Sequence, residues 1–428
     1  MEEERLFASG KEVTPVAMYG DKPKDRIILH CDCNNFFASV EETLRPELRD
    51  VPMAVAGDPE SRHGIIVAKN QKAKAFGVQT AETIWQAKKK CPDLVCVPSH
   101  HRLYHEFYEK INAIYLEYTD LVEPFSVDES YLDVTNSIHL FKMTPKELAD
   151  HLRARIKEEL DITISVGVSF CKVFAKLGSD YKKPNATTVI MREDVERIVY
   201  PLPVSSLIFV GKRSVEVLEQ YHIRTCGDLV QYDQQTLQRI LGKSGDTLYE
   251  YIHGLESSRV HSWYEKHEPK SIGNSMTFRH DLVGEAELKA GISALCDSVA
   301  GRLRHAGKKC RTVQIGIRNP DFVTIQRQTT LDVPTYLKSE LVSVSMKLLR
   351  DNWDMTKPVR LLSVTGSELV NADEEIVEQL SLFGAETTDG KSPKDREKQE
   401  KIESTIDELR EKYGKGSITL GFNRLDRE

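Results

Sequence analysis

The sequence predicts an α+β protein of several domains, and three observations support this. The chain has 428 residues, enough for several compact domains. Residues 102–191 alternate helix-like and strand-like patterns in an order that suits a ferredoxin-like α+β unit. From Ser271 onward the pattern reads β-α-β-β-α-β, with a final strand at residues 360–367. The first 25 residues lack periodicity and form an extension to which we assign no role.

The charge is unevenly distributed along the chain. The formal net charge is −7, yet residues 259–370 carry 17 Lys or Arg against 12 Asp or Glu, and residues 371–428 carry 10 against 15. A basic module followed by an acidic tail suits local contact with phosphates. For any single cation in this region, an ordinary solvated surface is the alternative.

Cysteine usage and hydropathy favour a reduced cytoplasmic protein without membrane association. The eight cysteines form no C-x-x-C pair, and the first ten residues are acidic, unlike a signal peptide. No apolar run approaches the length of a membrane span. Cys31 and Cys33 flank Asp32, but alternation along a strand points both thiols away from that carboxylate, so we expect them in the core.

Three carboxylates are placed at the ends of predicted strands. Residues 26–32, R-I-I-L-H-C-D, read as a buried strand that ends on Asp32. Val122–Thr135 reads as strand, tight turn and strand, with Asp128 and Glu129 at the connection. A solvated acidic loop is the alternative for this pair alone. Together the three side chains form an oxygen-rich site that suits Mg²⁺ or Mn²⁺, as used in phosphoryl transfer by two metals about 4 Å apart.

Three long motifs carry a family resemblance. H-C-D-C-N-N-F-F-A-S-V-E, F-S-V-D-E-S-Y-L-D-V and V-G-V-S-F-C-K-V-F-A-K-L-G-S-D-Y-K-K-P-N resemble the Y-family, the lesion-bypass DNA polymerases, and are most similar to the DinB/polymerase IV-like branch. The resemblance runs from about Asp25 to the end of the chain. It implies a right-hand fold with a palm (26–35 and 102–191), small fingers (36–101), a helical thumb (192–258), a linker (259–270), a little finger (271–370) and an acidic tail (371–428).

The resemblance implies template-directed DNA synthesis. Deoxynucleotides would be added to a primer 3′-hydroxyl by two Mg²⁺ ions, with Mn²⁺ as an alternative, at low fidelity and without proofreading. Asp32 and Asp128 would bridge both metals, Glu129 would complete the primer-side ion, and the Cys33 carbonyl the nucleotide-side ion.

The nucleotide contacts expected from the family include one departure. Phe37, five residues after Asp32, occupies the steric-gate position, where a flat ring would exclude a ribose 2′-hydroxyl; its neighbour Phe36 suits a core role better. Gln71 and Lys74 stand where the polymerase IV-like pattern has Tyr and Arg, and resemble the UmuC branch at this spot. Lys74 supplies charge but not the bidentate fork of an Arg. Lys183 matches the family's triphosphate-contacting lysine.

The expected DNA contacts lie in the thumb and the little finger. The thumb resembles a helix-hairpin-helix element in which backbone amides near Gly211 and the side chain of Lys212 hold a DNA phosphate without reading sequence. Only one of the hairpin's two usual glycines is present. A second phosphate patch is predicted near one helix–strand connection of the little finger, formed by Arg302, Arg304, Lys308, Lys309 and Arg311.

The acidic tail contains a candidate partner motif. Its residues, Gln379, Leu380, Ser381, Leu382 and Phe383, closely resemble the peptide by which bacterial polymerases hold the sliding clamp. Packing of Leu382 and Phe383 back on the little finger is the alternative. Farther on, Ile402, Ile406, Leu409 and Tyr413 recur at helical spacing and predict an amphipathic helix of unassigned role. We expect a monomer that binds primer-template DNA, deoxynucleotides and the clamp.

Two other functions remain open from the sequence. The Gln71/Lys74 departure allows a UmuC-like subunit that needs accessory proteins for activity. A clamp-tethered DNA-binding scaffold without catalysis is the second. The three retained carboxylates argue against the scaffold, because uncompensated charges destabilise a fold.

Overall fold

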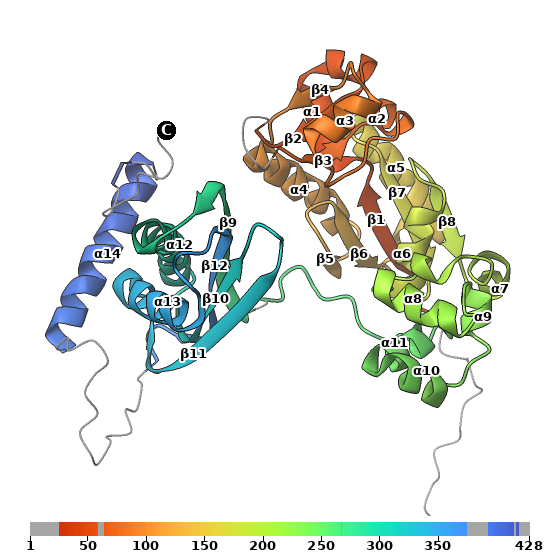
Figure 1. The fold of residues 1–428 in the computed structure, drawn as a ribbon. Coiled ribbons are helices and arrows are strands. Elements are labelled where there is room, and N and C mark those ends of the chain that lie inside the picture. The colour runs from red at the N-terminus through yellow and green to blue at the C-terminus, as the bar shows by residue number, and fades with distance from the viewer. Residues whose placement is uncertain (1–24, 59–63, 267, 375–392, 415–416, 419–428) are drawn as a thin grey trace, which may run out of the picture. The chain divides into compact units, whose positions relative to one another are not determined.

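The structure is a computed structural model that describes residues 25–58, 64–266, 268–374, 393–414 and 417–418 (Figure 1). The chain forms two compact units, one from Met1–Ala56 and Ile65–Glu265, the other from Gly57–Gly64 and Lys266–Glu428. Both combine helices with sheets, as predicted. None of the described helices is long and apolar enough to span a membrane.

A five-stranded sheet is the centre of the first unit. Its strand order is β5 (Val122–Pro124), β6 (Glu129–Asp133), β1 (Ile28–Cys33), β7 (Ile164–Ser169) and β8 (Thr187–Ile190). Only the β7–β8 pair is parallel. Every residue of β1 and β7 is buried, as expected for strands covered on both faces.

Helices cover the two faces of this sheet differently. One face shares a core with α4 (His101–Leu116) and α5 (Pro145–Leu160), and Cys31 and Cys33 lie in that core. Their predicted burial is confirmed. Helix α6 (Lys172–Tyr181) covers the other face, toward which alternation points His30 and Asp32.

Close packing of α6 on the sheet depends on a glycine. A Cβ atom at Gly167 would lie 1.9 Å from the carbonyl oxygen of Ala175, so only glycine permits this approach. The short approach lets side chains of α6 reach the end of β1.

A small α/β region follows β1. Its sheet has the order β3 (Ile66–Lys69), β2 (Met53–Ala56), β4 (Val95–Val97). The helices beside it are α1 (Phe36–Leu44), η1 (Pro46–Asp50), α2 (Gln71–Ala75) and α3 (Ile84–Lys90). Gln71 and Lys74, singled out in the sequence, both lie on α2.

Residues 192–258, expected to be a helical thumb, form short helices, and one further short helix, η2, lies at residues 138–141. They are η2 (Ile138–Phe141), η3 (Arg192–Asp194), α7 (Val195–Ile198), η4 (Val204–Ser206), α8 (Lys212–Gln220), α9 (Cys226–Leu229), α10 (Gln234–Leu241) and α11 (Lys243–Ile252). All but η2 belong to residues 192–258, where they enclose an apolar core that includes Leu218, Leu237 and Leu248.

The second unit has the predicted β-α-β-β-α-β order. Its antiparallel sheet runs β11 (Thr324–Thr335), β10 (Lys308–Arg318), β12 (Val359–Asn371), β9 (Ser271–Leu282), and the helices are α12 (Glu285–His305) and α13 (Lys338–Asn352). The final strand, predicted at residues 360–367, is longer than predicted, because the exposed Glu368 and Asn371 also belong to it.

Helix α14 (Pro393–Tyr413) packs on this second unit through charged side chains. Its buried Glu403 accepts hydrogen bonds from the backbone N–H of Lys338, the first residue of α13, at 3.1 and 3.2 Å. The guanidinium of Arg304 on α12 bonds to Glu403 and lies 2.6 Å from Asp407. Thus the predicted helix is present, but polar contacts to α12 and α13 contribute to its docking.

Candidate active site

A cavity of about 400 Å³ lies in the first unit, where the end of β1 meets the small α/β region. From the five-stranded sheet and its loops it is lined by Asp32, Cys33, Val127, Asp128, Glu129 and Lys183. From α1 and the small sheet it is lined by Asn35, Phe36, Phe37, Val67, Ala68, Lys69 and Thr80. The structure therefore brings all three predicted carboxylates to one cavity.

Strand register positions the carboxylates. Asp32 and Glu129 are direct partners in the antiparallel β1–β6 pair. Asp128 lies in the connection just before β6, and its carbonyl accepts a hydrogen bond of 2.9 Å from the N–H of Cys33. The Asp128 carboxylate accepts a hydrogen bond from Ser126 Oγ at 2.5 Å. Backbone pairing thus fixes the three residues together, although 96 residues separate Asp32 from Asp128 in sequence.

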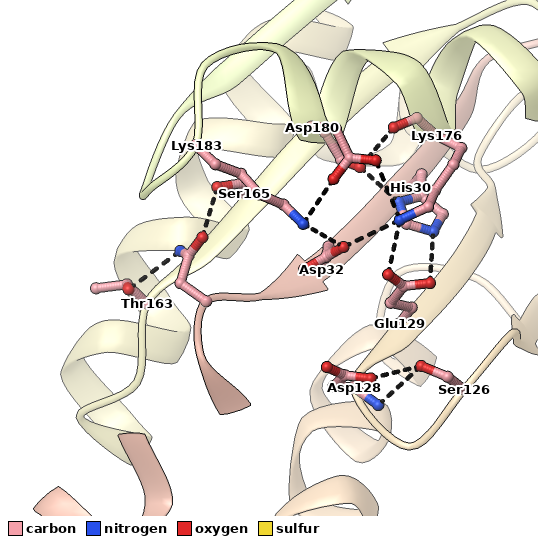
Figure 2. A network of polar contacts seen from close by, with 12 residues as sticks. His30, Asp32, Ser126, Asp128, Glu129, Thr163, Ser165, Lys176, Asp180 and Lys183 are labelled. Carbon is pink, nitrogen blue, oxygen red and sulfur yellow. Dashed lines mark hydrogen bonds and ion pairs between the residues drawn. The ribbon is translucent and has the colours of Figure 1, made fainter. Parts of the chain in front are cut away.

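Two lysines form ion pairs with Asp32 and Glu129, as Figure 2 shows. Lys176 Nζ on α6 lies 3.1 Å from Asp32 Oδ2 and 2.7 Å from Glu129 Oε1. Lys183 Nζ lies 2.6 Å from the same Asp32 oxygen. Asp180 contacts both ammonium groups, at 3.3 Å and 2.7 Å. Lys183 was predicted from the sequence, whereas Lys176 and Asp180 were missed.

The charges in this network shift its pKa values in opposite directions. Burial raises the pKa of Asp32, but hydrogen bonding from Glu129 and the charges of Lys183 and Lys176 outweigh it, so the net shift is downward. Burial and the contact with Asp32 raise the pKa of Glu129. Burial, reinforced by Asp32, raises the pKa of Asp128 despite the Ser126 bond. A proton taken up by the Asp32–Glu129 pair therefore resides on Glu129.

The buried His30 also belongs to this network and was not identified from the sequence. It precedes Asp32 by two residues, so alternation along β1 points both toward α6. Its Nδ1 lies 2.8 Å from Ser179 Oγ, whose hydroxyl donates to the Lys176 carbonyl, so Nδ1 carries the proton. Its Nε2 lies 3.8 Å from Glu129. Burial, followed by repulsion from Lys176, lowers the pKa of His30, which keeps the ring neutral.

The donor atoms fit a hard divalent cation. Three carboxylates supply only oxygen, the ligand that Mg²⁺ and Mn²⁺ prefer, and burial makes uncompensated charge costly there. Across the described ranges, no group of three or more His, Cys, Asp or Glu side chains converges in a geometry that could hold a metal. In this structure the ammonium groups of Lys176 and Lys183 contact Asp32, and Lys176 also contacts Glu129.

The predicted nucleotide contacts are only partly brought together. Phe36 and Phe37 line the cavity at the start of α1. Gln71 and Lys74 are exposed on α2 and do not belong to its lining. Lys69 and Thr80 line it instead, joined by a hydrogen bond of 3.1 Å. Neither residue was assigned a role from the sequence.

The predicted DNA contacts lie elsewhere in the chain. Gly211 and Lys212 are exposed at the N-terminus of α8. In the second unit, Arg302 and Arg311 are exposed. Lys308 forms an ion pair with Glu268, and Lys309 forms one with Glu400.

One member of the predicted phosphate patch requires correction. The Arg304 side chain is only 11% exposed, and its guanidinium bonds to Glu403 and Asp407 of α14. It is therefore engaged within the protein and is not an available phosphate ligand in this structure. This pairing could not be predicted from local sequence pattern, because the partners are about 100 residues apart. The clamp-like motif at residues 379–383 lies outside the described residues.

Family models match three segments of the chain. Residues 31–180 match the impB/mucB/samB family, and residues 269–382 match its C-terminal domain. Residues 207–256 match a model described as the thumb domain of DNA polymerase iota. The first match includes all three carboxylates.

Whole-chain comparisons agree with these matches. A DNA polymerase IV from Acetivibrio thermocellus is 43% identical over 402 residues, covering 94% of this chain and 98% of the relative. A DNA polymerase IV from Bacillus velezensis is 37% identical over 398 residues, covering 93% of each chain. A solved Y-family DNA polymerase chimera of Dbh and Dpo4 superimposes with a TM-score of 0.72 at 24% identity, covering 81% of this chain and 99% of the chimera.

Proposed function

This chain belongs to the impB/mucB/samB family, the Y-family DNA polymerases of the polymerase IV type, and we propose that its cavity is the site of template-directed translesion DNA synthesis. The observation that carries this proposal is the meeting of Asp32, Asp128, Glu129, Lys183 and Phe37 around one cavity. These residues come from three separate segments of the chain: 32–37, 128–129 and 183. Low fidelity and the lack of proofreading belong to the same proposal.

Membership in the family implies a general requirement for a divalent metal ion. We assign Asp32, Asp128 and Glu129 as its ligands, with the Cys33 carbonyl as a further donor, and Mg²⁺ as the ion, two per site. When bound, the metal would supply positive charge that acidifies a primer hydroxyl and stabilises developing negative charge on phosphate. Strand register fixes the backbone positions of Asp32 and Glu129.

The remaining cavity residues are assigned to the nucleotide. Lys183 places an ammonium beside Asp32, where it would neutralise triphosphate oxygens. Phe37 would contact the sugar and reject a 2′-hydroxyl, with Phe36 beside it. The exposed Gln71 and Lys74 are kept as proposed contacts to the triphosphate. Lys69 is a further cation in the lining and supports a site for an anionic ligand.

The DNA would be held outside this cavity. We propose that residues 192–258 act as the thumb, with Gly211 and Lys212 at a DNA phosphate, and residues 271–370 as the little finger. Residues 36–101 would be the fingers, and the five-stranded sheet the palm. In the little finger, Arg302, Lys308, Lys309 and Arg311 remain proposed phosphate contacts, without Arg304.

Binding to a sliding clamp is proposed from sequence alone. The motif Gln379–Phe383 supports it, as does its position after the folded β12. We also expect the chain to act as a monomer, since the site described above is complete within one chain.

Primer extension by the purified chain tests the proposal. With Mg²⁺, deoxynucleotides and a short primer-template, we expect template-directed extension without any added protein. Extension only after adding accessory proteins would instead support a UmuC-like subunit. DNA binding without extension under any condition would support a scaffold. The relatives named DNA polymerase IV, aligned over more than nine-tenths of the chain, favour the first outcome.

A further inference from the structure

The ring of Phe37 rests on the ring of Tyr104. Their centroids are 4.1 Å apart and their planes differ by 13°, a stacked arrangement. Phe37 lines the cavity, whereas Tyr104, on α4, is 1% exposed and lies outside the cavity lining. His101 adds an edge contact to Phe37 at 6.0 Å. The position of the Phe37 ring in the cavity therefore depends on where Tyr104 is held.

Tyr104 is held through its hydroxyl by Glu41. The phenol donates a hydrogen bond of 2.6 Å to Glu41 Oε1. Glu41 follows Phe37 by four residues on α1, so the two side chains project from the same face of the helix, one turn apart. Tyr104 thus contacts two successive turns of α1, with its ring on Phe37 and its hydroxyl on Glu41.

The Glu41 carboxylate is buried but fully compensated. Its side chain is inaccessible to solvent, and it accepts further bonds from His100 Nδ1 at 2.7 Å and from the Arg45 guanidinium at 2.6 Å. Burial opposes ionisation, yet the bonds from Tyr104, His100 and Arg45 outweigh it and lower the pKa of Glu41. Burial and Glu41 raise the pKa of Tyr104, so its phenol remains a donor. A charge-assisted hydrogen bond of this kind is short and directional.

We propose that Glu41 is a positioning residue for sugar selection, which acts by fixing Tyr104 against Phe37. The proposal rests on the gate role proposed above for Phe37. It extends that role to a carboxylate that touches neither the cavity nor a nucleotide. A small displacement of the Phe37 ring would admit the extra oxygen of a ribose, because discrimination against an added hydroxyl depends on close steric fit.

Tyr104→Phe tests the link most cleanly, because it removes the hydroxyl and keeps the stacked ring. The measurement is the ratio of kcat/KM for a deoxynucleotide to that for the matching ribonucleotide, on one primer-template. We expect this ratio to fall by roughly fivefold or more. Glu41→Gln keeps an acceptor oxygen for Tyr104 and should retain more of the ratio than Glu41→Ala.

Tyr118→Phe is the matched control. Tyr118 belongs to the same core, and its hydroxyl also contacts neighbouring side chains, His151 at 2.9 Å and Arg155 at 3.1 Å, away from Phe37. Removing it should lower stability by a similar amount and leave the sugar ratio unchanged. Melting temperatures of all variants show whether they fold.

Comparing Tyr104→Phe with Phe37→Ala distinguishes a failure of the proposed positioning role of Glu41 from a failure of the proposed gate role of Phe37. If Phe37→Ala changes the sugar ratio and Tyr104→Phe does not, the positioning role is wrong while the gate stands. If both nucleotides lose insertion equally in Tyr104→Phe, the hydrogen bond is only structural and the inference is overturned. If Phe37→Ala itself leaves the ratio unchanged, the gate assignment fails, and the inference fails with it.

Discussion

Asp32 and Glu129 face each other across one position of the antiparallel β1–β6 pair, and the ammonium of Lys176 lies within 3.1 Å of both carboxylates. Like charges directly opposite each other destabilise a sheet. The fold tolerates this pair because Lys176 and Lys183 supply compensating charge. The same arrangement makes the site sensitive to pH, to divalent metal and to substitution of either lysine.

The first prediction concerns pH. Burial and Asp32 raise the pKa of Glu129 from 4.5 to about 7. Between these values the unfolded chain has lost the proton and the folded chain retains it, so stability falls as pH rises and stays lower above pH 7. Glu129→Gln removes this cost. In EDTA at pH 8 we expect it to stabilise the protein by on the order of 1–3 kcal/mol.

Thermal melts at pH 8 and pH 4.5 check this. At pH 4.5 the folded Glu129 is protonated and the unfolded residue about half protonated, so most of the advantage of Glu129→Gln should be lost. An equal difference in melting temperature at both pH values would contradict the raised pKa.

Lys176→Met should strengthen metal binding. The substitution removes a cation that lies 2.7 Å from Glu129 and would repel a divalent ion at the same carboxylates. We expect the Kd for Mn²⁺, measured on the DNA-free protein by electron paramagnetic resonance at pH 8, to fall about tenfold or more. Lys172→Met is the control, because Lys172 lies one turn earlier on α6 and pairs with Glu123 at 2.7 Å, outside the cavity lining. An unchanged Kd in Lys176→Met would exclude competition between lysine and metal.

Asp128→Ala should abolish primer extension and leave DNA binding nearly intact, because the carboxylate lines the cavity and is assigned to the metal. Extension and DNA affinity are measured on the same preparation. Asp150→Ala, on α5 outside the cavity lining, controls for loss of a carboxylate. Extension by Asp128→Ala within about tenfold of wild type, or about 1.4 kcal/mol in barrier height, would show that the site is wrongly assigned.

Phe37→Ala should raise ribonucleotide insertion far more than it changes deoxynucleotide insertion, because removing the ring opens space beside the sugar. Side-by-side insertion assays measure both. Phe36→Ala is a useful comparison, since Phe36 is only 3% exposed and packs in the core. It should reduce stability without selectively admitting ribonucleotides.

Replacing both Leu382 and Phe383 by Ala should leave synthesis on a short primer-template unchanged and remove stimulation by a loaded sliding clamp. Each apolar side chain buried in a pocket contributes roughly 1.5–3 kcal/mol, so losing both would weaken a modest peptide affinity severely. Basal extension, clamp-stimulated extension and melting temperature are compared. Lower stability with the clamp response retained would favour packing on the little finger.

The sequence predicted most of the fold because its strands and helices have clear periodicity. The buried β1 reads as an apolar run at residues 26–32, and the β-α-β-β-α-β order after Ser271 was predicted as observed. Strand β12 was predicted too short, because the exposed Glu368 interrupts the apolar signal just after the predicted end at residue 367. Side-chain pattern therefore located this strand but did not fix its end.

Prediction of the site was less complete for a physical reason. Motifs identified Asp32, Glu129 and Lys183, since their residue types and spacing are characteristic. Lys176 and Glu41 were missed because their importance lies in contacts between distant segments: Lys176 reaches β1 across 144 residues, and Glu41 meets Tyr104 across 63. Such contacts depend on tertiary packing, which periodicity in one element does not encode.

Helix α14 is held on the second unit by contacts with residues that are far away in the sequence. Glu403 accepts the first N–H of α13, and Arg304 is neutralised by residues about 100 positions away. These hydrogen bonds and ion pairs satisfy polar groups on α14 and also polar groups on α12 and α13. We therefore expect a separate peptide comprising Pro393–Tyr413 to bind a shortened chain that ends after β12.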